Sequence, residues 1–181
     1  MKMVRVFTLV ALGLVSAAQA AFISGSIAFG GAYDTQPTSN NLLTATGLKF
    51  KDVSVATNTQ FGDYAAIPNG TAATYSDLTF SPFVAGQLWT ISVGPTTYSF
   101  WLDSCNVLLH NSQVLALTGT GTASMTGYED TPGRWSITAN KNGRSMSFSS
   151  GADVPDAGTS IALFGAALLG LGFVRRILSR R

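Results

Sequence analysis

Charged side chains are scarce in this chain of 181 residues, where Asp, Glu, Lys and Arg make up 11% against about 25% in typical soluble domains. There is one cysteine, Cys105, so no disulfide can form within the chain. There is one histidine, His110, whereas hydrolytic triads and most transition-metal sites need histidine together with partner groups. The sequence therefore predicts neither a disulfide-stapled fold nor a histidine-based active centre.

The few charges are distributed unevenly along the chain. Basic residues gather at the two ends, as Lys2, Arg5, Arg175, Arg176, Arg180 and Arg181. Residues 21–153 hold five basic and eight acidic side chains, a net charge of −3. The middle of the chain thus has no basic face for nucleic acid, and we expect no nucleic-acid partner.

Residues 1–20 follow the order of a secretory signal peptide. The basic residues Lys2 and Arg5 precede an apolar segment over 6–15, and Ala18-Gln19-Ala20 supplies small residues for cleavage. We predict cleavage after Ala20, so that the mature chain begins at Ala21. An uncleaved anchor is the alternative, but a membrane-spanning helix needs about 20 apolar residues.

Residues 21–151 are predicted to form an all-β domain, because short stretches with period-2 alternation recur and helical periodicity is absent. The alternation places Trp89 and Ile91 on one strand face, and Trp135 and Ile137 on another. Predicted strands cover 22–29, 41–49, 52–57, 76–80, 88–93, 97–103, 107–109, 114–118, 121–126, 135–140 and 144–149. We expect polar loops over 34–40 and 58–73.

This pattern favours an antiparallel β-sandwich or jelly roll, since so many one-faced strands suit two packed sheets. Asn142-Gly143 lies between two alternating stretches and predicts a hairpin that joins 135–140 to 144–149. A core of this size is sufficient to fold without disulfides.

Candidate chemical groups in the domain are few and dispersed. Cys105 is expected to be a small buried apolar side chain, and His110 to be an ordinary residue at a strand end. Glu129-Asp130 is expected to be a solvated turn, since the spacing of a calcium loop is absent. We therefore predict no cofactor, no metal site and no catalytic residue. Aromatic side chains that would stack on sugars if exposed are Trp101, Tyr75 and Tyr128.

The C-terminal segment has the pattern of a membrane anchor. Residues 157–174 hold no charge, and as a helix they would extend ~27 Å, just enough to cross a bilayer. The arginines at 175–181 would stop transfer and stay in the cytoplasm. We therefore predict one transmembrane helix over 157–174, a basic cytoplasmic tail over 175–181, and the domain outside.

The sequence VPDAGTSIALFGAALLGLGFVRR, which begins at Val154, resembles the PEP-CTERM class of bacterial sorting signals, and most closely its VPDSG-CTERM variant. Val154, Pro155, Asp156 and Gly158 match that motif, and Ala157 takes the place of its serine. Residues 117–151 resemble, more loosely, the stretch that often precedes such signals. The resemblance assigns 152–158 to a linker and sorting motif.

The resemblance implies a destination for the protein in the cell. Members of this class are exported, held in the inner membrane by the tail, and cut near the motif by an exosortase, in bacteria that make exopolysaccharide. We therefore expect a non-enzymatic protein of the cell surface or extracellular matrix, with exosortase and the membrane as partners. The alternatives are a carbohydrate-binding module that docks to exopolysaccharide and, with least support, a weak glycan hydrolase using two carboxylates.

Overall fold

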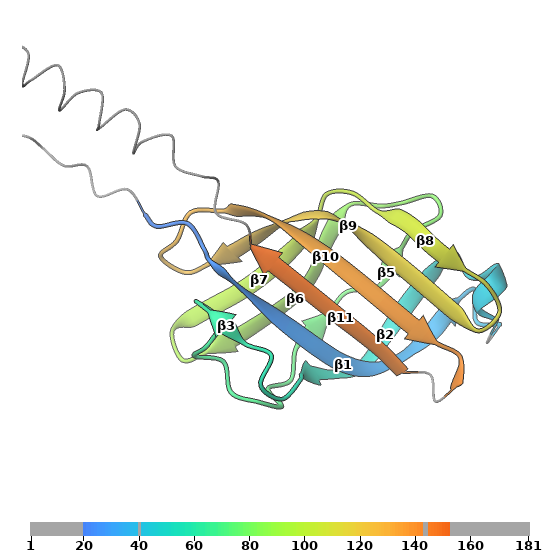
Figure 1. Ribbon diagram of the computed structural model, residues 1–181, viewed down its shortest axis with the longest axis horizontal. Helices are drawn as coiled ribbons and strands as arrows, with labels where there is room; N and C mark the ends of the chain where they lie inside the picture. Colours follow the sequence, from blue (N-terminus) through green and yellow to red (C-terminus); the bar gives the residue numbers. More distant parts are fainter. Residues whose placement is uncertain (1–19, 40, 143–144, 153–181) are drawn as a thin grey trace, which may run out of the picture.

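Eleven strands build the fold in the computed structural model, which describes residues 20–39, 41–142 and 145–152 (Figure 1). The strands are β1 (Gly25–Gln36), β2 (Gly47–Val55), β3 (Phe61–Gly62), β4 (Thr74–Tyr75), β5 (Leu78–Thr79), β6 (Gly86–Val93), β7 (Thr96–Leu102), β8 (Asn106–His110), β9 (Val114–Met125), β10 (Thr131–Asn140) and β11 (Ser145–Ala152). A short 3-10 helix, η1 (Leu42–Thr44), precedes β2. The predicted all-β class is confirmed.

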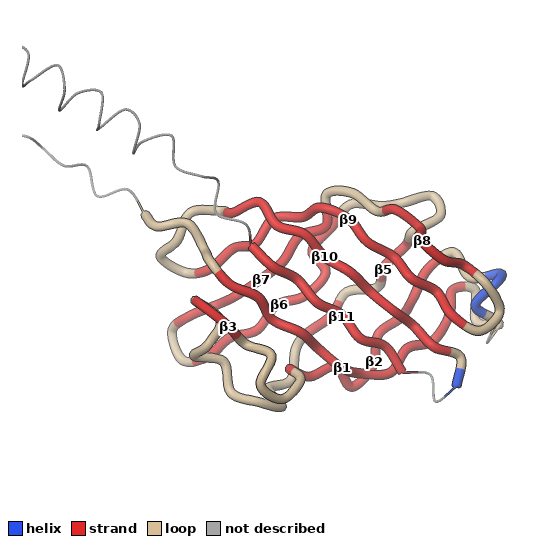
Figure 2. The backbone as a smooth tube through the Cα atoms, viewed as in Figure 1, coloured by secondary structure: helices blue, strands red, loops and turns tan. Residues whose placement is uncertain are grey.

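The strands form a single antiparallel sheet that curls, in place of the two packed sheets that we predicted. The order along the sheet is β4-β6-β7-β9-β10-β11-β1-β2-β5, with β3 added beside β1 and β8 beside β9. Figure 2 shows long strands along the body of the molecule and loops gathered toward its two ends. Alternation along a strand tells which face is buried, but a curled sheet and a sandwich bury the same face.

The segment 70–80 joins the two ends of this sheet. On one side, the amide of Val55 in β2 donates to the carbonyl of Thr71 at 2.9 Å, and the amide of Ala73 donates to the carbonyl of Val53 at 3.0 Å. On the other side, β4 pairs with β6, and the amide of Ser76 donates to the carbonyl of Leu88 at 2.8 Å. One short segment therefore supplies backbone hydrogen-bond partners to both neighbours at this seam.

Large aromatic side chains fill the inside of the curl. The largest fully buried ones are Trp89, Trp135, Tyr64, Tyr98, Phe29, Phe100 and Phe148. Phe148 of β11 lies near the middle of this cluster, with ring centroids 5.9 Å from Phe29 and 6.3 Å from Phe100. The predicted faces of β6 and β10 are confirmed, since Trp89 and Ile91 are buried together, as are Trp135 and Ile137.

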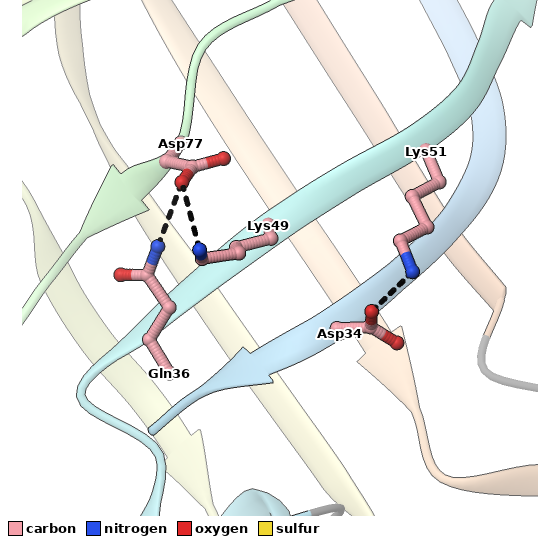
Figure 3. Close-up of polar contacts among 5 residues, drawn as sticks. All are labelled: Asp34, Gln36, Lys49, Lys51 and Asp77. Carbon is pink, nitrogen blue, oxygen red and sulfur yellow. Dashed lines mark hydrogen bonds and ion pairs between the residues drawn. The ribbon is translucent and has the colours of Figure 1, made fainter. Parts of the chain in front are cut away.

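The first strand is longer than predicted, because Asp34, its one charged residue, lies between the buried Tyr33 and Thr35 and so faces outward. The expected loop over 34–40 begins three residues late: Asp34 pairs with Lys49 of β2, and Gln36 with Gly47. Asp34 forms an ion pair with Lys51, and Asp77 accepts a 2.9 Å hydrogen bond from Gln36 (Figure 3). Lys51 and Asp77 are more than half exposed, so we expect these contacts to add little stability.

The predicted loop over 58–73 is also partly wrong. It contains β3, and it buries Tyr64 and Ile67 against the core. The Tyr64 ring packs 5.9 Å from Tyr98 and 6.4 Å from Trp89, measured between centroids. The loop therefore covers the core at the end of the sheet where β1 begins.

The predicted hairpin between β10 and β11 is confirmed in its pairing. Asn140 lies opposite Ser145, and Trp135 opposite Ser150. Gly143, the second residue of the predicted turn, lies outside the described residues. β11 also pairs along β1, so the last strand of the domain lies between the second-last strand and the first.

Candidate functional site

The start of the first strand and the end of the last strand lie side by side. Gly25 at the start of β1 lies opposite Ala152 at the end of β11, and the antiparallel ladder continues from there to Ala32 and Ser145. In Figure 1 the blue start of β1 and the orange tip of β11 meet at the same end of the sheet. The predicted signal-peptide cleavage site and the predicted sorting motif therefore adjoin one end of the domain.

The N-terminal side of this end is hydrogen-bonded to the domain close to the predicted cleavage bond. Ala20 and Ala21 are exposed. The carbonyl of Ala21 accepts a 3.0 Å hydrogen bond from the amide of Glu129, and the amide of Ile23 donates at 2.9 Å to the hydroxyl of the buried Thr131. An exposed alanine pair beside a fixed strand suits a peptidase site, which stays a prediction. Ala18 lies outside the described residues.

The C-terminal side of this end stops at Ala152, two positions before the predicted motif. Val154, Pro155, Asp156, Ala157 and Gly158 lie outside the described residues, as do the predicted helix over 157–174 and Arg175, Arg176, Arg180 and Arg181. Within the described ranges, the structure contains no helix long and apolar enough to cross a membrane. The predicted anchor and its orientation stay predictions.

The dispersed chemical groups of the domain have structural partners. The Nε2 atom of His110 lies 2.6 Å from the carbonyl oxygen of Leu42, and its ring packs edge-on against Phe80. Asp103 accepts a hydrogen bond from Thr122, and Asp130 accepts one from Ser124. Among residues 20–39, 41–142 and 145–152, His, Cys, Asp and Glu form no group of three that would hold a metal ion. These contacts give His110 and both carboxylates hydrogen-bond partners within the domain.

Cys105 is half-buried, packs against the core and has a free thiol. Burial raises the pKa of this thiol from an ordinary value of 9.0 to about 11. Because the thiolate is the reactive form, we expect its fraction at pH 8 to fall about a hundredfold on folding. Iodoacetamide should therefore alkylate the folded protein far more slowly than the same protein in urea, as followed by intact mass. Equal rates in the two conditions would contradict this.

Of the three aromatic candidates, the structure leaves one with an exposed ring. Tyr75 is packed against Phe29 and Phe50, and burial raises the pKa of its hydroxyl well above the ordinary range. Tyr128 is half-buried. Trp101 points outward from β7 and is 50% exposed. The candidate surface for stacking is therefore the outer face around Trp101.

The neighbours of Trp101 on this face are polar side chains or proline from three other strands. The register places Gln87 of β6 and Thr122 of β9 on either side of Trp101, and Pro132 of β10 beyond Thr122. An open depression of about 390 Å³ adjoins this row, lined by Asp103, Thr120, Gly121, Pro132, Gly133 and Arg134. Alternation predicts that these threonines face outward. It does not predict that they meet Trp101, since pairing across strands is not encoded in the period.

Comparison with known families identifies the C-terminal segment. Residues 153–178 match the family model of the VPDSG-CTERM motif. No curated protein matches the chain, and no solved structure matches it. The matched segment is consistent with an exosortase sorting signal, as the sequence predicts, and such a signal implies an exported protein directed to the cell surface that meets exosortase-type processing machinery.

Proposed function

We propose that this protein is an exported, non-enzymatic component of the cell surface or extracellular matrix. Residues 157–174 hold it in the inner membrane, with the domain outside and the arginines in the cytoplasm, until an exosortase cuts near 154–158. The match over 153–178 carries this proposal. The role of the released domain is structural or adhesive.

The position of β11 supports a processing site that lies close to the folded domain. An extended chain spans at most about 3.5 Å per residue, so a bond within 154–158 lies at most roughly 20 Å from Ala152. Pro155 resists helix, and the residue before a proline prefers extended geometry. We therefore expect the motif to be a short, extended connection between β11 and the membrane.

Substitution of the motif tests this proposal. In a host with the matching exosortase, Pro155→Ala and Asp156→Ala should each leave the tail attached and the protein in the membrane fraction. Ala157→Ser, which restores the serine of the motif, should be processed at least as well as the natural chain. Intact mass of the protein from each strain distinguishes cut from uncut chains. If the natural chain keeps its full tail in that host, the proposed processing is wrong.

An adhesive role through polysaccharide is a second candidate function, and one observation favours it. Trp101 is a large exposed aromatic on the middle of the sheet, flanked by side chains suited to hydrogen bonding with hydroxyl groups.

A further inference from the structure

We infer that the outer face around Trp101 is a binding site for a polysaccharide chain. The inference rests on the proposed function in one respect, namely that export brings the protein to a place where polysaccharide is present. An indole offers a broad apolar face together with one N–H donor, and a sugar ring offers C–H groups on its faces and hydroxyl groups around its rim. Half of the Trp101 surface is accessible, whereas Trp89 and Trp135 are 1% and 2% exposed.

The row beside Trp101 is longer than a single sugar ring. Gln87, Trp101, Thr122 and Pro132 occupy matching positions on four adjacent strands, β6, β7, β9 and β10. Strands lie about 4.8 Å apart, so the row extends for about 14 Å across the sheet. Side chains directly opposite each other have Cβ atoms about 5 Å apart. A chain of sugars laid across the strands would therefore contact Trp101 and both flanking side chains together.

The depression next to this row is lined by hydrogen-bonding groups that include one negatively charged and one positively charged side chain. Thr120 lies directly opposite Arg134, and both are exposed together with Asp103. The Thr122 hydroxyl donates to Asp103 Oδ2 at 2.9 Å, which fixes the carboxylate beside the row. Carboxylate and guanidinium groups form the stronger, charge-assisted hydrogen bonds with hydroxyl groups. The site therefore combines one stacking surface with a carboxylate acceptor and a planar donor.

The same geometry disfavours other classes of ligand. Nucleic acid needs a basic surface, and residues 21–153 carry a net charge of −3. A peptide that adds a strand needs a free sheet edge, whereas β7 and β9 at this site are paired on both sides. The depression is open to solvent, so it provides no deep, enclosed pocket for a peptide side chain.

Affinity electrophoresis tests the inference with dextran, hydroxyethylcellulose and sodium alginate, each cast separately into native gels. The full chain is run in a zwitterionic detergent, because detergents with sugar headgroups would compete for the site. We expect at least one polymer to retard the natural chain. Trp101→Ala and Arg134→Ala should each weaken that retardation roughly tenfold. The same polymer should change the tryptophan emission of the natural chain, since Trp101 is the exposed indole.

Phe61→Ala is the matched control, because Phe61 is an exposed aromatic, at 61%, that lies on β3 away from this row. Its retardation should equal that of the natural chain. The inference is overturned if none of the three polymers retards the protein, or if Phe61→Ala loses retardation while Trp101→Ala keeps it. The measurement does not depend on tail cleavage, so failure of processing and failure of binding are seen separately.

Discussion

A chain that ends at Asn142 should not fold, whereas a chain that ends at Ala152 should fold fully. The difference is β11, which pairs through eight positions with β1 and through eight with β10. Its loss removes two complete ladders and the Phe148 ring, and it uncovers Phe29 and Trp135. We expect the cost to exceed the whole stability of a domain of this size, about 5–15 kcal/mol.

Circular dichroism and thermal melting of the two truncated chains, both starting at Ala21, measure this effect. The longer chain should show a cooperative transition, and the shorter one should show none and be digested rapidly by protease. A shorter chain that melts cooperatively near the temperature of the longer one would show that β11 is dispensable. Because β11 is the last strand of the described sheet, the sheet is complete only when the chain extends to Ala152.

The sequence predicts which face of each strand is buried better than it predicts which strands are neighbours. Alternation places Trp135 and Ile137 inside β10, and the structure agrees, because the period of two is a local property. Gly25 pairs with Ala152, although the two residues lie far apart in the sequence, and no local pattern specifies this pairing. The distinction between a sandwich and a curled sheet depends on such distant pairings.

Turn and charge signals are the other source of error. The polar composition of 34–40 predicts a loop, but an outer strand face accepts a charged residue such as Asp34 when a partner such as Lys51 lies beside it. The residues over 58–73 hold few apolar side chains, yet two of them, Tyr64 and Ile67, are enough to bind this segment to the core. Polar composition shows that a segment contacts water and leaves open what its few apolar residues contact.

The sorting motif and the face around Trp101 also differ in how far the sequence alone predicts them. The sorting motif is a linear signal, so the residues at 154–158 are identified by their order alone. The face around Trp101 is assembled from four strands. The sequence identifies Trp101 as a candidate but does not predict which side chains lie beside it. Exposure of Trp101 follows from alternation with the buried Phe100 and Leu102, while its proximity to Thr122 and Pro132 follows from the register alone.

Replacement of Phe148 by alanine should lower the free energy of unfolding by about 3–5 kcal/mol. The ring is fully buried, and its centroid lies 6.1 Å from that of Tyr75 and 6.5 Å from that of Trp135. Its removal leaves a cavity between rings that come from opposite parts of the curled sheet, and these rings cannot collapse together without moving their strands. Urea unfolding followed by tryptophan emission measures this change in free energy. Thermal melting of the same variant should show a fall in Tm of roughly 10–20 °C.

Ser149→Ala is the control on the same strand, because Ser149 faces outward and shares an exposed 2.9 Å hydrogen bond with Ser136. Its effect should stay within about 0.5 kcal/mol. If Phe148→Ala were as mild as the control, the aromatic cluster would not hold the curl together. The backbone hydrogen bonds of the seam at 70–80 would then have to do so, and Val55→Pro, which removes the amide that donates to Thr71, would become the more damaging substitution. A large loss for Phe148→Ala with a mild effect of Ser149→Ala would instead place the stability of the curl in ring packing across its interior.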